Sequence, residues 1–333
     1  MGYIVGIDQG GTKTHSVVMD RQGSLLGDYK TEGCYFPRDG IKAAMEVVAR
    51  AVRNTLDNAI VNIDDVEMIV AGITGIDYEG DETLVKEALQ TLYPATTIIV
   101  CNDCEIAYYS GTLNPIGAVI CAGTGINAAL FAPNGDKFVM SDYLKNSLQG
   151  GVAIAQRALE AVMDSDLGAL PATALTQVFL DFSHEEVIYE VLRRFITESD
   201  FAIEMISLVP KIIETADNGD QVARDVLNNY SAELCRCFVA ALNKMGMLKL
   251  DCDVVLAGSV FKGPVNYLVE IMTKDLLEKA PNINIINAGY EPVVGACILG
   301  MIKLNGSFEE KMDERTKLSG EKLGLLRSSP EIK

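Results

Sequence analysis

A short stretch near the start of the chain, GIDQGGTKT (residues 6–14), combines glycine, threonine and lysine in a way that suits phosphate binding. Backbone N–H groups of glycines can approach phosphate oxygens closely, and threonine and lysine add donors. It is not a Walker loop, because Thr12 intrudes before the Lys13-Thr14 pair. The following residues 15–23, HSVVMDRQG, have strand character rather than helix character, which also excludes a dinucleotide-binding loop. The pattern predicts a phosphate-binding turn inside a β-hairpin.

A similar turn occurs again in the middle of the chain. Residues 10–23 align with AGTGINAALFAPNG (122–135), with Gly11 on Gly123 and Thr12 on Thr124. Two further pairs of segments follow in the same order. Residues 68–75 and 254–261 each form a strand running into an Ala-Gly turn, and residues 96–111 and 283–300 each form a strand leading through a loop into a helix. Such an ordered repeat predicts a duplicated α/β chain.

The second half is longer than the first because of an insert at about 150–250. Apolar residues recur there at three- and four-residue spacing, which is typical of amphipathic helices that form a core. We therefore expect an N-terminal domain over 1–115 and a C-terminal domain over 116–305 with this helical insert. The charged tail at 306–333 is expected to pack loosely or fray.

The composition limits the function classes. Asp and Glu number 46 against 28 Lys and Arg, a formal charge of −18 that opposes binding to nucleic acid and to anionic membranes. No signal peptide or membrane span is expected, and eight scattered cysteines are typical of reduced thiols in a cytoplasmic protein. Cys101-x-x-Cys104 and Cys235-x-Cys237 could be redox or metal pairs, but only two histidines accompany them, and we read them as structural.

Four blocks carry a resemblance to a known family: GIDQGGTKT, VCNDCEIAYYSG, ICAGTGINAALFAPNGD, and VVLAGSVF with EPVVGACILGM. The chain resembles the N-acetylglucosamine kinase-like branch of the BadF/BadG/BcrA/BcrD ATPase family, within the actin, hexokinase and heat-shock chaperone superfamily. The resemblance implies an α/β fold of two duplicated ribonuclease-H-like domains. It also implies an ATP- and Mg²⁺-dependent kinase that phosphorylates an amino sugar, such as N-acetylglucosamine, N-acetylmuramic acid or glucosamine, and acts as a homodimer.

The resemblance also assigns roles to single residues. The phosphate-binding residues would be Gly10, Gly11, Thr12, Lys13, Thr14, Gly123, Thr124 and Gly125. Asp8 would hold Mg²⁺ through water, and Gly258 and Ser259 would contact adenosine. Asn127 and Gly75 would contact the sugar. Asp103 would be the general base that takes the proton from the sugar hydroxyl, although an Asp here could instead be the N-cap of the helix that follows.

The acceptor region departs from the family pattern. Family members usually carry an acidic Gly-Asp-Glu-Gly-Ser-Gly-like loop, where this chain has NSLQGG (146–151). An early loop that normally supplies an Asn instead has Tyr35, Phe36 and Arg38. Aromatic rings with a cation and without carboxylates suit a bulkier or anionic acceptor, so we expect a sugar with a carboxylate or a large acyl group to be preferred.

Two other functions stay open. Activator ATPases of 2-hydroxyacyl-CoA dehydratases hold an iron–sulfur cluster with a Cys just before the Gly-Thr-Gly turn, where this chain has Cys121, and a second Cys downstream. The corresponding stretch SDYLKNSLQ (141–149) contains no Cys, so a ligand would be missing. The third possibility is a nucleotide-binding protein that has lost catalysis, which the loss of the acidic loop favours and the presence of Asp8 and Asp103 opposes.

Overall fold

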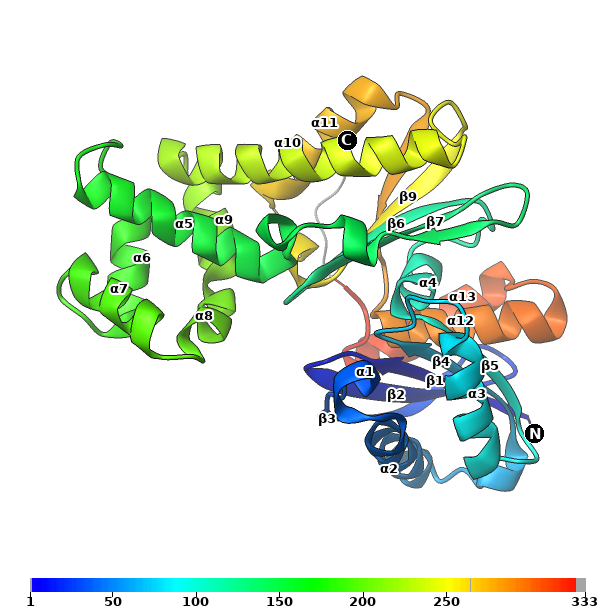
Figure 1. The fold of residues 1–333 in the computed structure, drawn as a ribbon. Coiled ribbons are helices and arrows are strands. Elements are labelled where there is room, and N and C mark those ends of the chain that lie inside the picture. Colours follow the sequence, from blue (N-terminus) through cyan, green and yellow to red (C-terminus); the bar gives the residue numbers. More distant parts are fainter. Residues whose placement is uncertain (1, 264, 328–333) are drawn as a thin grey trace. The chain divides into compact units, whose positions relative to one another are not determined.

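The computed structural model describes residues 2–263 and 265–327, which form two compact units. The first unit contains residues 2–115 together with Ala288–Arg327, and the second contains Ile116–Asn287. Figure 1 shows both units. None of the described helices is long and apolar enough to cross a membrane.

The first unit is built on a five-stranded sheet in the order β3-β2-β1-β4-β5. The strands are β1 (Tyr3–Gln9), β2 (Lys13–Asp20), β3 (Leu25–Glu32), β4 (Val66–Ile73) and β5 (Thr97–Asn102). The first three strands are antiparallel neighbours, and β4 and β5 run parallel to β1. The expected hairpin around residues 10–12 is therefore present. The carboxyl ends of β1, β4 and β5 meet at one edge of the sheet, where α/β proteins commonly place ligands.

Alternation along the strands supplies both faces of this sheet with apolar side chains. Val5 and Ile7 pack under α2 (Ile41–Ala59) and α3 (Asp81–Leu92). Ile4 and Val17 pack on the opposite face, which α12 (Pro292–Asn305) and α4 (Asp103–Tyr109) cover. The even-numbered positions of β1, including Asp8, thus belong to the α12 face.

The second unit contains a sheet in the order β8-β7-β6-β9-β10, the same order as the first sheet. Its strands are β6 (Gly117–Ala122), β7 (Ile126–Phe131), β8 (Lys137–Val139), β9 (Cys252–Ala257) and β10 (Ile283–Asn287). Again three strands are antiparallel, and two more run parallel to the first of them. The duplication predicted from the sequence is confirmed at the level of topology.

Helices fill the expected insert in the second unit, and Figure 1 shows them extending from the sheet. They are α5 (Gly150–Asp166), α6 (Leu175–Ser183), α7 (Ile188–Thr197), α8 (Phe201–Glu204), α9 (Val209–Asp217) and α10 (Gln221–Lys244), followed by α11 (Tyr267–Lys279). The short segments are α1 (Phe36–Asp39), η1 (Ile63–Asp65), η2 (Ser141–Tyr143), η3 (Asn146–Leu148), η4 (Met205–Leu208) and η5 (Ser259–Phe261). A continuous apolar core joins helices α5 to α11 to one face of the second sheet.

The end of the chain differs from the expected domain boundaries. Residues 288–305 were expected in the C-terminal domain but pack as α12 on the first sheet. Helix α12 packs there because its sequence is apolar and its small residues allow close approach. A Cβ on Gly295, for example, would lie 2.0 Å from the Ile106 carbonyl oxygen of α4.

The expectation of a loose or fraying tail is wrong for the described part of it. Residues Glu310–Leu323 form α13, which belongs to the first unit. Thr316 Oγ1 donates to the Gly23 carbonyl at 2.7 Å, and Ser319 Oγ accepts the Leu25 N–H at 2.9 Å. Small polar side chains on one face of α13 therefore form hydrogen bonds with backbone groups of the β2–β3 turn. The expectation of a fraying tail considered only its charged residues and overlooked these side chains. Residues 328–333 lie outside the described residues.

Candidate active site

The turn between β1 and β2 presents two backbone donors. The Gly10 N–H donates to the Lys13 carbonyl at 2.8 Å and closes the turn. It is therefore not available to a ligand, although the sequence pattern predicted that it would bind phosphate. Gly11 and Thr12 are exposed, and within the described residues their N–H groups make no hydrogen bond. These two donors, with the Thr12 hydroxyl and the half-exposed Lys13 ammonium, are those that suit a phosphate.

Thr14 does not belong to this set, contrary to the expectation from the sequence. Its side chain is buried, and its Oγ1 accepts from Gln9 Nε2 at 3.5 Å. Gln9 Nε2 also donates to the Ala44 carbonyl of α2, which places both side chains on the α2 face. The period of two along a strand explains this, because Lys13 and Thr14 must point to opposite faces.

The second turn, residues 123–125, is held by the start of α5. Its Gly123 N–H donates to the Gly125 carbonyl at 2.9 Å and is likewise unavailable. The Gly123 and Thr124 carbonyls accept N–H groups of Gly151 at 2.8 Å and Val152 at 3.2 Å. In the part of the chain that the structure covers, the N–H groups of Thr124 and Gly125 remain without a partner. This turn resembles the first in offering two backbone donors.

The NSLQGG segment explains how that turn is positioned. Gly150 has φ +47°, and a Cβ there would lie 2.1 Å from the Gly125 carbonyl oxygen. Only glycine fits so near a neighbouring backbone. The two glycines of this segment therefore support the turn. Comparing the segment with the acidic loop of the family did not predict this role.

The expected adenosine contacts lie directly behind the second turn. Gly258 has φ +101°, and a Cβ there would lie 2.1 Å from the Ala122 carbonyl oxygen. Ser259 Oγ lies 3.7 Å from the Cβ position of Gly123. Asn127 faces Cys121 across the β6–β7 ladder, and its Oδ1 accepts the Ala128 N–H at 2.8 Å. Gly258, Ser259 and Asn127 are thus grouped at one end of the second sheet.

Asp103 opens α4 at the carboxyl end of β5. The helix cap is not Asp103 but Asn102, whose Oδ1 accepts the Cys104 N–H at 2.9 Å. Asp103 Oδ1 is shielded from solvent and has no hydrogen-bond partner among the described residues. A buried carboxylate oxygen without a donor is costly, and it persists where function requires it. The alternative reading of Asp103 as an N-cap residue is therefore not supported.

Burial raises the pKa of Asp103, the nearby charges of Asp8 and Asp77 add to this effect, and the resulting pKa is about 7. Hydrogen bonds from the Cys104 N–H and the Thr74 hydroxyl act in the opposite direction. A carboxylate that titrates near neutral pH is suited to accept a proton from an alcohol during a reaction. Asp77 and Thr74 were missed in the sequence; both follow β4, the strand next to β5.

Asp8 lies on β1 opposite His15 of β2. Burial raises the pKa of Asp8, Lys13 and His15 lower it, and Glu291 raises it. The buried His15 places its Nε2 at 2.9 Å from Asp28 Oδ2. A partly buried carboxylate beside one lysine suits a hard cation such as Mg²⁺. Within the described residues, no group of three or more His, Cys, Asp or Glu side chains could hold a metal ion without further ligands.

The expected acceptor loop divides into parts with different roles. Tyr35 packs on Gly75, since a Cβ on Gly75 would lie 2.8 Å from the ring. Phe36 is buried in the core of the first unit and is not available to a ligand. Arg38 pairs with Asp39 through two hydrogen bonds, at 2.7 and 2.9 Å, and is not a free cation. The pair holds the pKa of Asp39 well below its usual range.

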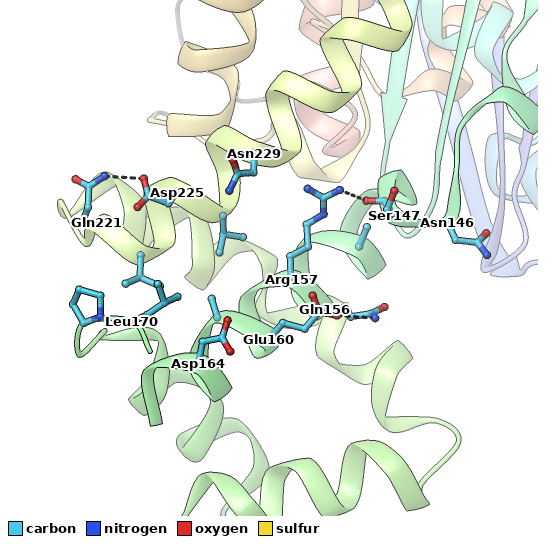
Figure 2. A pocket seen from close by; sticks show the side chains of 15 residues that line it. Asn146, Ser147, Gln156, Arg157, Glu160, Asp164, Leu170, Gln221, Asp225 and Asn229 are labelled. Carbon is cyan, nitrogen blue, oxygen red and sulfur yellow. Dashed lines mark hydrogen bonds between the residues drawn. The ribbon is translucent and has the colours of Figure 1, made fainter. Parts of the chain in front are cut away.

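A cavity of about 810 Å³ lies elsewhere, between α5 and α10 of the insert. Figure 2 shows its polar lining, with Gln221 bonded to Asp225 and Arg157 bonded to the Ser147 carbonyl. Asn146 and Ser147 connect it to the NSLQGG segment, but none of the other predicted site residues lines it.

Known sugar kinases match this chain over most of its length. The chain is 27% identical over 316 residues to N-acetyl-D-glucosamine kinase of Dictyostelium discoideum, covering 89% of this chain and 97% of that protein. It is 26% identical over 313 residues to N-acetylmuramic acid/N-acetylglucosamine kinase of Clostridium acetobutylicum, covering 90% and 98%.

Among solved structures, a ROK family glucokinase from Streptomyces griseus in complex with glucose and AMPPNP matches with a TM-score of 0.59 at 18% identity, covering 90% of this chain and 99% of that one. This likeness confirms the sugar-kinase type of fold. The model of the BadF/BadG/BcrA/BcrD ATPase family matches residues 5–300, nearly the whole length. The chain belongs to the BadF/BadG/BcrA/BcrD ATPase family.

Proposed function

We propose that this chain is an ATP-dependent kinase that transfers the γ-phosphoryl group to a hydroxyl group of an amino sugar. N-acetylglucosamine, N-acetylmuramic acid and glucosamine are the candidate acceptors. The observation that carries the proposal is Asp103 at the carboxyl end of β5, a carboxylate whose shielded Oδ1 has no hydrogen-bond partner among the described residues. The names of the two curated relatives support the substrate class.

In the proposed reaction, Asp103 accepts the proton as the sugar oxygen attacks the γ-phosphorus. The new O–P bond forms while the bond between the γ-phosphorus and the β,γ-bridging oxygen breaks, so that ADP leaves. Asp103 then releases the proton to solvent. A pKa of about 7 lets this carboxylate hold and release a proton under neutral conditions.

The nucleotide would be held by backbone donors. The N–H groups of Gly11 and Thr12 in the first unit, and of Thr124 and Gly125 in the second, are the candidates for phosphate contacts. Gly258 and Ser259 would contact the adenosine. Asp8 would hold Mg²⁺ together with the phosphates, and the ion, when bound, offsets the negative charge on the phosphate oxygens.

The test is phosphoryl transfer from labelled ATP to a panel of sugars, with Asp103→Asn as the catalytic variant. The substitution should lower kcat by about 10²–10⁴ while the Kd for nucleotide hardly changes, because the base contacts the acceptor. Glu105→Gln, two residues further along α4, is the matched control and should retain activity. Equal losses of nucleotide affinity and turnover in Asp103→Asn would mean that Asp103 is structural.

The activator ATPase is the second candidate, and Cys121 is the observation that favours it. This thiol is half-buried in β6, just before the second turn. Anaerobically purified protein should contain no iron if the kinase assignment is right. Stoichiometric iron that is lost in Cys121→Ser would support the activator instead. The expected homodimer and cytoplasmic location remain predictions.

A further inference from the structure

The side chain of Asn102 joins two segments next to the proposed base. Asn102 is the last residue of β5, is only 6% exposed, and lies beside Ile73, the last residue of β4, in the parallel ladder. Its Oδ1 accepts the Cys104 N–H of α4, and its Nδ2 donates to the Ile76 carbonyl at 2.9 Å and to Asp77 Oδ1 at 3.1 Å. One amide group therefore holds both the start of α4 and the segment that follows β4.

The partners of this amide fix its orientation. Oδ1 can only accept, and it meets an N–H group, whereas Nδ2 can only donate, and it meets a carbonyl and a carboxylate. The Ile76 side chain belongs to the apolar core of the first unit, and the bond from Nδ2 to the Ile76 carbonyl is itself buried. Water does not readily replace a donor in such a place, so losing Nδ2 would leave the segment without a strong bond.

The segment between β4 and α3 carries groups that act on Asp103. The Thr74 hydroxyl forms a hydrogen bond with Asp103, and Asp77 lies close enough for its charge to act on that carboxylate. Gly75, an expected contact of the sugar, lies between these two residues and packs against the Tyr35 ring at 2.8 Å from its Cβ position. The place of this segment therefore determines the surroundings of the base and one side of the expected acceptor site.

Other bonds tie this segment to β1 and to α3. The Thr74 N–H donates to the Gln9 carbonyl of β1 at 2.9 Å. Asp81 Oδ2, at the start of α3, accepts the Tyr78 N–H at 2.9 Å. Neither β1 nor α3 carries the proposed base. The Asn102 amide adds the connection to β5 and α4, between which the base lies.

We propose that Asn102 is a positioning residue, which holds residues 74–77 against the start of α4 and so places an acceptor hydroxyl group at Asp103. The inference rests on the proposed kinase function. Asn102 acts through its neighbours, because its buried amide is already engaged in three hydrogen bonds. Loss of Nδ2 should therefore weaken acceptor binding and phosphoryl transfer and leave the phosphate turn between β1 and β2 unchanged.

The experiment measures kcat and the KM for N-acetylglucosamine, together with the Kd and stoichiometry of AMPPNP binding by calorimetry. Asn102→Ser keeps an oxygen that can cap α4 but removes Nδ2. We expect the KM to rise and kcat/KM to fall by about 10–100-fold, as for a misplacement of about 1 Å, with AMPPNP binding unchanged. Asn102→Thr also keeps the cap, suits the end of a strand, and should give the same result if the serine variant does not fold.

Asn62→Ser is the matched control, because Asn62 is also an N-cap residue whose Oδ1 accepts a backbone N–H, but it is exposed and precedes η1. It should leave the KM unchanged. A purely structural role of Asn102 would lower kcat and the stoichiometry of AMPPNP binding together at constant KM. That result, or an unchanged kcat/KM, would overturn the inference and leave the kinase proposal intact. A wild type that phosphorylates no sugar would refute the kinase proposal and this inference with it.

Discussion

Gly33 lies directly against Gly11: a Cβ on Gly33 would come within 2.4 Å of the Gly11 carbonyl carbon and of the Thr12 nitrogen. The Cys34 N–H, next in the chain, donates to the Gly10 carbonyl at 3.1 Å. The segment that carries Tyr35 therefore packs directly against the turn between β1 and β2. Since Tyr35 also packs on Gly75, these two expected acceptor residues are joined by packing to the turn between β1 and β2 within the first unit.

Replacing Gly33 should therefore disturb the phosphate turn without touching its residues. In Gly33→Ala the added methyl group meets backbone atoms, which cannot move aside as a flexible side chain can. We expect the Kd for ATP to rise by about tenfold or more, measured by calorimetry. Gly289→Ala is the control, because a Cβ at Gly289 meets nothing within 4 Å. Equal affinities in the two variants would show that the turn does not depend on this contact.

The pH dependence of the reaction should report Asp103. Because burial and the charges of Asp8 and Asp77 raise its pKa to about 7, the base is protonated and inactive at lower pH. We expect kcat/KM to rise as the pH increases through about 7. Asp77→Asn removes one of these charges and should move the midpoint to lower pH, whereas Glu105→Gln should not. A flat profile from about pH 5.5 to 8.5 would contradict the assignment of Asp103 as base.

Ionisation of Asp103 should also destabilise the folded protein at high pH. Folded chains keep its proton up to about pH 7, whereas unfolded chains release it near the ordinary value of 3.8. Its favourable contribution is thus complete below the unfolded pKa and is lost as the pH rises through the folded pKa. In thermal melts, the Tm of Asp103→Asn relative to that of wild type should accordingly be higher at about pH 8 than at about pH 5. The exposed Asp65→Asn serves as the control, and an identical Tm difference at both pH values would argue against a buried, protonated Asp103.

The attachment of α13 can be tested in the same way. Thr316→Val keeps the shape of the buried side chain but removes the hydrogen bond to the Gly23 carbonyl. Leaving that carbonyl without its donor should lower the free energy of unfolding by about 1–3 kcal/mol, measured by urea denaturation. Leu318→Ala, on the exposed side of the helix, should change little. If Thr316→Val matches wild type, the hydrogen bond from Thr316 to Gly23 contributes nothing to the stability of the first unit.

These contacts also show how far the sequence could predict the molecule. The repeat of the Gly-Thr turns correctly predicted a duplicated chain, because hairpin signals are local, and the two sheets indeed share one strand order. The path of α12 could not be predicted, since either sheet could accept an apolar helix. Gly150 is a similar case: its nearness to Gly125 is a tertiary contact, invisible to a comparison that counted acidic residues.

The acceptor preference is the expectation that the structure changes most. The sequence predicted that Arg38 would pair with a carboxylate on the sugar, but Asp39 already accepts two hydrogen bonds from this guanidinium. The pair is exposed, with 70% of the Arg38 side chain accessible, so solvent weakens it and a substrate could compete. Asp39→Asn should release the cation and raise kcat/KM for N-acetylmuramic acid several-fold, about 2–5 times, with N-acetylglucosamine little affected. Neutral N-acetylglucosamine is the internal control, and Arg38→Ala should abolish the gain when it is combined with Asp39→Asn. A double variant that keeps the gain would show that Arg38 does not contact the acceptor.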